Sequence, residues 1–212
     1  MVILFDLDGT LIDSTEAILE SFHHSFDVHS LKHPTDEAIK ALIGYPLDIM
    51  YAQLGIEEAN VWTMVDTYKL HYRKIACQKT FLLPSAKASI ELASQHAKLG
   101  VVTTKTARYS KELLEHFNLM HYFEVLIGRE DVIKPKPDAE PINKALESFT
   151  CNKSLCWMIG DTRMDIASAQ NAGIYHVGVL SGYDNEEELN ELTTLIKKDT
   201  YEAVKYIITK KK

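Results

Sequence analysis

Residues 2–10 read Val-Ile-Leu-Phe-Asp-Leu-Asp-Gly-Thr, and this stretch decides which fold the chain can adopt. The run Val2–Phe5 is apolar on both faces, which is typical of a strand buried inside a parallel sheet. Asp6 and Asp8 follow at once, and their spacing of two residues directs both carboxylates to one face of an extended chain. In an open α/β sheet, ligands bind beyond the carboxyl ends of the strands. The first strand therefore predicts a functional site directly after it.

Similar apolar runs recur along the chain, and each of them ends at a polar or glycine-bearing turn. We expect buried strands at Val2–Phe5, 100–102, 123–127, 155–159 and 176–180. Stretches typical of helices alternate with them, at 85–98, 109–117, 138–149 and 164–172, and Gly173 is expected to end the last one. This alternation predicts an α/β fold with a doubly wound parallel sheet.

One interval, residues 15–82, breaks the alternation, because no convincing strand follows Ser14 until about Leu82. We expect helices there at 15–26, 36–43, 47–54 and 57–76, separated by Gly44-Tyr45-Pro46 and by Gly55. An insertion of about 70 residues is too long for a simple crossover between strands. The sequence therefore predicts two domains, an α/β core of residues 1–14 and 83–212 and a helical cap of residues 15–82.

Composition excludes several classes of protein. The chain has 212 residues, 46% apolar residues and a formal net charge of −7, which is ordinary for a folded protein and unlike a disordered or collagenous one. Dispersed basic residues in an acidic chain argue against nucleic-acid binding. No apolar run approaches the roughly 18 residues of a membrane span, and the first residues do not resemble a signal peptide. The three cysteines form no even set that would suggest disulfide bonds, which is typical of a reducing compartment. We therefore expect a cytoplasmic protein without a membrane partner.

Polar residues also follow the other predicted strands, at the edge where Asp6 and Asp8 lie. They are Thr103-Thr104-Lys105, Lys134-Pro135-Lys136-Pro137, and Asp161 with Asp165 in Gly-Asp-x-x-x-Asp. Converging carboxylates repel one another unless a cation lies among them, and a set of oxygen ligands without His or Cys suits Mg²⁺ better than zinc.

A Mg²⁺ site beside a hydroxyl group and a lysine suits a phosphoryl group. The cations neutralise the negative phosphoryl oxygens, so that a carboxylate can attack the phosphorus in line. One aspartate then forms an aspartyl phosphate, while the other protonates the leaving alcohol and later deprotonates the attacking water.

These motifs, in this order, resemble the haloacid dehalogenase superfamily, and in particular its phosphatases with a helical cap after the first motif. The resemblance implies a Rossmann-like core, with Asp6 as nucleophile and Asp8 as general acid/base. It implies that the phosphate is bound by Thr103, Thr104 and Lys136, and that Mg²⁺ is held by Asp6, Asp161, Asp165 and the backbone carbonyl of Asp8. Lys134 also precedes a proline, but the family pattern Lys-Pro-Asp-x-x-Pro fits residues 136–141, so we favour Lys136 and keep Lys134 as the alternative.

Within the superfamily, the chain is most similar to phosphoglycolate phosphatases and to a related group of pyrophosphatases. The resemblance implies Mg²⁺-dependent hydrolysis of a small phosphorylated metabolite, with 2-phosphoglycolate as the first candidate. Inorganic pyrophosphate and sugar phosphates are alternative substrates. A non-catalytic regulatory protein of this fold is a further alternative, although such a protein is expected to lose Asp6 or Asp8. The residues that could read the rest of the substrate are Tyr45, Arg73, Lys105 and Arg108. We expect a monomer or a homodimer.

The remaining polar residues are expected to have structural roles. The nine histidines show no metal-ligand spacing, so we expect them at the surface or partly buried with satisfied ring nitrogens. Asp13 and Ser14 are expected to cap the helix that follows, and Thr10 to fix the turn after Asp8. Cys151 and Cys156 are expected to be small packing residues beside the fourth strand.

Overall fold

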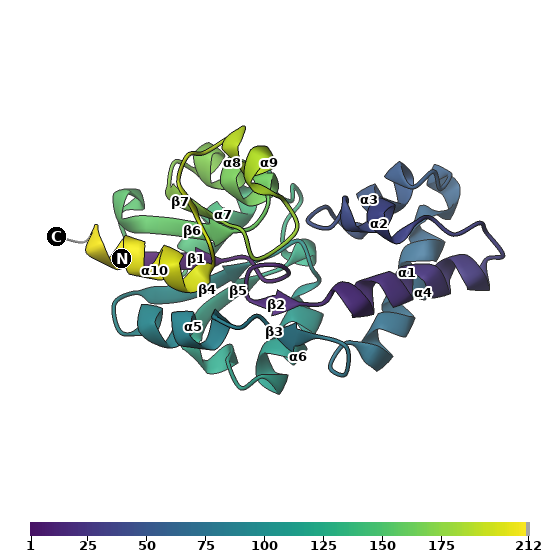
Figure 1. The fold of residues 1–212 in the computed structure, drawn as a ribbon, viewed down its shortest axis with the longest axis horizontal. Coiled ribbons are helices and arrows are strands. Elements are labelled where there is room, and N and C mark those ends of the chain that lie inside the picture. The colour runs from purple at the N-terminus through teal and green to yellow at the C-terminus, as the bar shows by residue number, and fades with distance from the viewer. Residues whose placement is uncertain (211–212) are drawn as a thin grey trace. The chain divides into compact units, whose positions relative to one another are not determined.

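The structure is a computed structural model that describes residues 1–210. The chain divides into two compact units (Figure 1). Unit 1 combines Met1–Asp13 with the residues from Leu82 onward, and unit 2 is Ser14–Phe81. Within residues 1–210, no helix has both the length and the apolar character that crossing a membrane requires.

Unit 1 is built on a six-stranded sheet in the order β5-β4-β1-β6-β7-β8, and its paired strands run parallel. The strands are β1 (Val2–Phe5), β4 (Lys98–Val102), β5 (Phe123–Ile127), β6 (Cys156–Gly160), β7 (Tyr175–Val179) and β8 (Ile196–Lys197). Strand β1 lies between β4 and β6, so the order of the strands reverses direction there. Such a switch point is where open α/β sheets bind ligands.

Helices cover both faces of β1, whose four residues are all buried. Val2 and Leu4 join one hydrophobic cluster with residues of α7 (Glu140–Leu146) and α8 (Arg163–Ala172), and these two helices also pack against each other. Ile3 and Phe5 point to the opposite face. The other helices of unit 1 are α5 (Ala86–Ser94), α6 (Ala107–His116), α9 (Glu186–Asn190) and α10 (Thr200–Thr209), with short 3₁₀ turns at Met120–Tyr122, Arg129–Asp131 and Lys153–Leu155. The predicted fold class, a parallel α/β sheet, is confirmed.

All five predicted strands are present: β1 and β5 have the predicted bounds, and the ends of β4, β6 and β7 are shifted by one or two residues. The strand predicted at 155–159 begins at Cys156, because Lys153–Leu155 forms a 3₁₀ turn. Helix α5 ends at Ser94, four residues earlier than predicted, because Lys98 already pairs with Val2 as the first residue of β4. Gly173 ends α8 in the left-handed conformation, at φ 70°, as expected.

Several elements lie outside the sequence predictions. They are β8, α10 and the two-residue strands β2 (Ile12–Asp13) and β3 (Phe81–Leu82), which pair with each other. Strand β3 lies at the end of the interval for which no strand is predicted. Both β2 and β3 are too short to produce a detectable apolar alternation.

Unit 2 contains helices only between its ends. They are α1 (Thr15–Val28), α2 (Asp36–Lys40), α3 (Leu47–Gln53) and α4 (Glu58–Ile75). All four helices are predicted from the sequence. The predicted ranges of α2, α3 and α4 are longer than the observed ones, and that of α1 is shorter. Its core centres on Phe22, whose ring lies 4.7 Å from the ring of Tyr51 and 5.0 Å from that of Tyr68, between centroids. Ser14 occupies the N-cap position of α1 without a side-chain cap hydrogen bond.

Candidate active site

The turn after β1 places Asp6 at the carboxyl end of the sheet. The backbone N–H of Asp6 donates to the carbonyl of Ile159 at 2.9 Å, which continues the pairing of β1 with β6 by one residue. The chain then turns at Gly9, which has φ 81°. A Cβ atom on Gly9 would lie 2.2 Å from Oδ2 of Asp161, so the turn requires glycine for its conformation and for this close approach.

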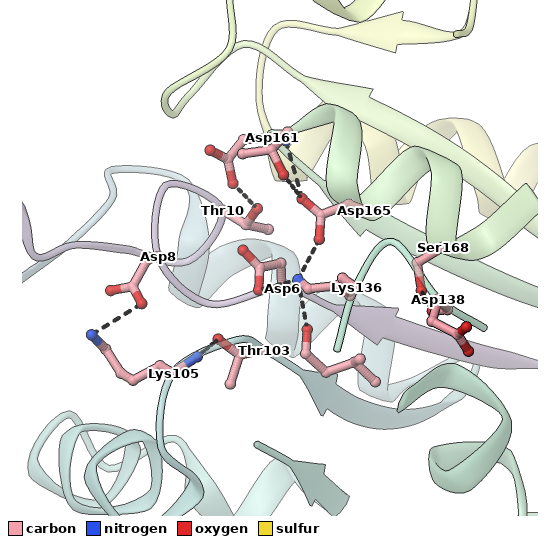
Figure 2. A network of polar contacts seen from close by, with 12 residues as sticks. Asp6, Asp8, Thr10, Thr103, Lys105, Lys136, Asp138, Asp161, Asp165 and Ser168 are labelled. Atoms are coloured by element: carbon pink, nitrogen blue, oxygen red, sulfur yellow. Dashed lines mark hydrogen bonds and ion pairs between the residues drawn. The ribbon is translucent and has the colours of Figure 1, made fainter. Parts of the chain in front are cut away.

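Three buried carboxylates gather at this edge, from Asp6, Asp161 and Asp165. One oxygen atom from each lies within 4.8 Å of the other two. Asp161 directly follows the last residue of β6, and Asp165 lies in the first turn of α8. The turn between this strand and this helix therefore brings both carboxylates to one site, as Figure 2 shows. The arrangement is the one that the spacing of four residues predicts.

Neighbouring groups hold two of these carboxylates by hydrogen bonds. Asp161 accepts from the hydroxyl of Thr10 at 2.7 Å and from the backbone N–H of Tyr183 at 2.9 Å. Asp165 accepts from the backbone N–H and the hydroxyl of Thr162, at 3.1 and 2.7 Å. These contacts fix the direction of both carboxylates before any ligand arrives.

Lys136 lies among the acidic groups and is itself buried. Its Nζ donates to Oδ1 of Asp6 at 2.8 Å, to Oδ1 of Asp165, and to the carbonyl of Val102 at 3.2 Å (Figure 2). By contrast, Lys134 is exposed. Of the two lysines that precede a proline, only Lys136 contacts the acidic group.

Burial changes the protonation of this cluster. It raises the pKa of Asp6 to about 7, opposed by the Lys136 ammonium and reinforced by the negative charge of Asp165. It also raises the pKa of Asp161 well above its usual range, with Asp6 and Asp165 adding to the effect. For Lys136, burial alone would lower the pKa, but the charges of Asp165 and Asp6 raise it, so this side chain remains an ammonium.

The cluster fits a divalent cation in charge and in ligand type. Three carboxylates and one ammonium leave a net charge of −2 in a buried site when all are ionised. A dication balances that charge and offsets the repulsion among the carboxylates, which adds to the effect of burial in raising the pKa values of Asp6 and Asp161. The donor atoms are carboxylate oxygens, which Mg²⁺ prefers.

Asp8 and Lys105 form a second ion pair beside the acidic cluster. Nζ of Lys105 lies 3.1 Å from Oδ2 of Asp8, and both side chains are largely buried. The carboxylate of Asp8 is not among the three that gather as possible metal ligands. Thr103 is buried, its hydroxyl accepts from the N–H of Lys105 at 3.2 Å, and Thr104 beside it is half-buried.

The remaining candidate residues lie outside this group. Arg108 is exposed on α6 and pairs with Glu112 at 2.9 Å. Tyr45 and Arg73 belong to unit 2, in the turn before α3 and on α4, and their roles stay predictions.

Some residues that support the site escape sequence reasoning. Thr162 starts α8 in a capping box with Asp165, and the Thr-x-x-Asp pattern was a usable signal for it. Tyr183 acts through its backbone N–H, so its side chain carries no signal. Ser181 donates from its hydroxyl to the carbonyl of Gly9 at 2.9 Å, across 172 positions of sequence.

The fold and the site are those of an α/β protein with a buried acidic cluster at the switch point of a parallel sheet. The sequence profile of the haloacid dehalogenase-like hydrolases matches residues 3–179, and the chain belongs to this family. The resemblance inferred from the motifs is thereby confirmed.

Individual relatives narrow the class further. The chain is 35% identical over 177 residues to pyrophosphatase PpaX of Halalkalibacterium halodurans, which covers 81% of this chain and 80% of the relative. It is 30% identical over 199 residues to phosphoglycolate phosphatase of Photorhabdus laumondii, at 88% and 83% coverage. A haloacid dehalogenase-like hydrolase of Streptococcus pneumoniae superposes with a TM-score of 0.87 at 25% identity, over 97% of each chain. The chain is a hydrolase of the phosphatase class.

Proposed function

We propose that this protein hydrolyses small phosphate monoesters with the help of Mg²⁺, and that Asp6 is the nucleophile. The observation that carries the proposal is the position of Asp6, buried at the end of β1, bonded to Lys136 and grouped with Asp161 and Asp165. A nucleophilic carboxylate needs cations around it to approach an anionic phosphoryl group.

In the first step, an oxygen of Asp6 forms a bond to phosphorus while the bond from phosphorus to the leaving-group oxygen breaks. Lys136 neutralises phosphoryl oxygens, and Thr103 and Thr104 donate hydrogen bonds to them. Asp6, Asp161, Asp165 and the backbone carbonyl of Asp8 would hold Mg²⁺. When bound, the metal neutralises charge on the phosphoryl group.

Asp8 is the proton carrier in this mechanism. Its protonated carboxyl gives a proton to the leaving-group oxygen in the first step. Its carboxylate then takes a proton from the water that attacks the aspartyl phosphate, which releases phosphate and restores Asp6. Lys105, at 3.1 Å, holds the Asp8 carboxylate in position between the two steps.

Replacing Asp8 by Asn is expected to lower steady-state turnover by about 10²- to 10⁴-fold, because general acid–base catalysis typically contributes that much. Since Asp6 remains, phosphoenzyme is expected to accumulate with a substrate whose leaving group needs no proton, such as p-nitrophenyl phosphate. Quenched-flow measurement of protein-bound phosphate checks both. Normal turnover in D8N would show that Asp8 is not the acid/base.

For the substrate, we propose 2-phosphoglycolate first and inorganic pyrophosphate second. Relatives of comparable identity are named phosphoglycolate phosphatase and pyrophosphatase. The 35% identity to a pyrophosphatase is the reason to keep pyrophosphate as the second candidate substrate. Both molecules bear a further anionic group beyond the reacting phosphoryl group. We propose that the helical unit of residues 15–82 is a cap that selects the substrate, and that Tyr45 and Arg73 contact the part of the substrate beyond the phosphoryl group.

A phosphate-release assay on a panel of metabolites, with and without Mg²⁺, tests this choice. The panel contains 2-phosphoglycolate, pyrophosphate, sugar phosphates and nucleotides. We expect the highest kcat/KM for one of the first two, only with Mg²⁺. Release from none of them would support the regulatory, non-catalytic alternative.

Replacing Lys105 by Met is expected to lower kcat/KM about tenfold more for 2-phosphoglycolate or pyrophosphate than for p-nitrophenyl phosphate. The reason is that Lys105 is a largely buried ammonium beside the acid/base, placed to attract an anionic leaving group. Lys111→Met, on the exposed face of α6, is the matched control and is expected to change neither value. An equal loss for all substrates would restrict Lys105 to positioning Asp8.

Mg²⁺ is expected to stabilise the protein against unfolding, because the cluster holds a net charge of −2 when ionised. At a Mg²⁺ concentration about 100 times the Kd, mass action adds about 2.7 kcal/mol to the free energy of unfolding. Thermal unfolding with increasing Mg²⁺ measures the effect, which Asp161→Asn is expected to weaken strongly. An unfolding temperature independent of Mg²⁺ would contradict the assigned metal site.

A further inference from the structure

Two histidines of unit 2 face each other through one nitrogen of each ring. Nδ1 of His23, on α1, lies 3.1 Å from Nδ1 of His33, in the connection between α1 and α2. The centroids of the two rings lie 5.0 Å apart, and the ring planes differ in direction by 22°. This pair lies outside the active site described above, and its residues belong to one unit.

The outer nitrogen of each ring is bonded to a carboxylate. Nε2 of His23 lies 2.7 Å from Oδ1 of Asp36, and Nε2 of His33 lies 2.8 Å from Oδ1 of Asp27. A carboxylate accepts hydrogen bonds, so each Nε2 carries its proton. In a neutral imidazole the other nitrogen then has a lone pair. With both rings neutral, the two Nδ1 atoms would therefore meet lone pair to lone pair, whereas the 3.1 Å hydrogen bond between them requires a proton on one of the two.

Two lone pairs at this distance repel unless an electrophile lies between them. A proton is one solution, and it makes one ring an imidazolium. A metal ion is the other, and the charge favours it, since two carboxylates with two neutral rings carry −2. A dication neutralises this group completely, whereas one proton leaves −1.

We propose that His23 and His33 bind a divalent transition-metal ion such as Zn²⁺ through their Nδ1 atoms. Zinc–imidazole bonds are about 2.0–2.1 Å long, so two of them at an angle of about 90–110° put the nitrogens about 2.8–3.4 Å apart. The observed 3.1 Å falls within that span. Asp27 and Asp36 supply the outer hydrogen bonds that fix the tautomer of metal-binding histidines.

The site is open to solvent, so ions can enter and water can complete the coordination. The side chains of His23 and His33 are 28% and 39% exposed. Imidazole nitrogen suits Zn²⁺, Ni²⁺ or Cu²⁺ and not Mg²⁺, so Mg²⁺ is not expected to occupy this site. A bound ion would join α1 to the chain just before α2, across residues 29–35.

Calorimetric titration with Zn²⁺ in saturating Mg²⁺ tests the proposal on the whole protein. We expect the wild type to bind one more equivalent of Zn²⁺ than the double variant H23Q/H33Q. The control H116Q/H121Q removes two exposed histidines of unit 1 and is expected to keep the extra equivalent. The same number of equivalents in the wild type and in H23Q/H33Q would overturn the proposal.

Two further measurements do not depend on removing the rings. In D27N/D36N both rings remain but their orienting carboxylates are lost, so the Zn²⁺ affinity of this site is expected to fall about 10- to 100-fold. In ¹⁵N spectra of the wild type, Zn²⁺ is expected to shift the Nδ1 resonances of His23 and His33. Unchanged affinity in D27N/D36N, or Nδ1 resonances that respond to pH but not to Zn²⁺, would show a shared proton only and overturn the proposal.

Discussion

Replacing Asp6 by Asn is expected to reduce phosphate release about 10⁴-fold or more, since removing the nucleophile of a covalent mechanism has effects of at least this size. The fold is expected to survive, because the substitution keeps the shape of the side chain. Burial already disfavours the charge of Asp6, raising its pKa to about 7, so D6N is expected to be no less stable than the wild type without Mg²⁺. Phosphate release and chemical unfolding of the same preparation measure both effects.

Asp66→Asn is the matched control, with the same chemical change on an exposed residue of α4. It is expected to keep the activity of the wild type. Turnover by D6N within tenfold of the wild type would exclude Asp6 as the nucleophile. Loss of folding in D6N would instead show that the carboxylate is needed for the structure.

Replacing Lys136 by Met is expected to affect stability and activity together. It leaves Asp6 and Asp165 buried without the ammonium that bonds to both. Removing one partner of a buried ion pair typically costs about 3–5 kcal/mol of unfolding free energy. Activity is expected to fall about 10²- to 10³-fold, because the same ammonium neutralises the phosphoryl group. Urea unfolding without Mg²⁺ and phosphate release with Mg²⁺ give the two values.

Lys134→Met is the control for this experiment, because Lys134 also precedes a proline but is exposed. It is expected to change stability by no more than about 0.5 kcal/mol, as is usual for surface substitutions. A larger loss of activity in K134M than in K136M would transfer the phosphate-binding role to Lys134.

The core of the fold was predictable because parallel strands buried on both faces are uniformly apolar. The run Val2–Phe5 and the strands at β4 to β7 stand out for this reason. Strand β8 does not, because its two residues Ile196 and Lys197 contain only one apolar side chain. The early end of α5 was hidden as well, since only pairing with β1 shows that Lys98 belongs to a strand.

The acidic site was predictable because its side chains follow strand ends directly, and strand ends of a parallel sheet meet at one edge. The contacts between these side chains were harder to predict. The bond of Lys136 to Asp6 spans 130 positions, and the N–H of Tyr183 reaches Asp161 without any side-chain chemistry. The pair Asp8 and Lys105 was predicted as two separate candidates, and only the structure joins them.

The histidine pair illustrates a different limit. His23 and His33 are ten positions apart, in a helix and in the connection after it, so no ligand spacing indicates them. Their approach depends on the path of residues 29–35, where Ser30 adopts φ 53°. Sequence reasoning treated these histidines as structural, and the proposed metal site rests on tertiary geometry alone.

The most direct test of the mechanism is to locate the covalent phosphate. D8N is mixed with p-nitrophenyl phosphate and Mg²⁺, quenched in acid and digested, and the peptides are analysed by mass spectrometry. The mechanism predicts a peptide that contains Asp6 and carries the mass of one phosphoryl group, with fragmentation placing the group on Asp6. It also predicts no such peptide from D6N. A phosphoryl group on another residue, or none in a preparation that still releases p-nitrophenol, would contradict the assignment of Asp6 as the nucleophile.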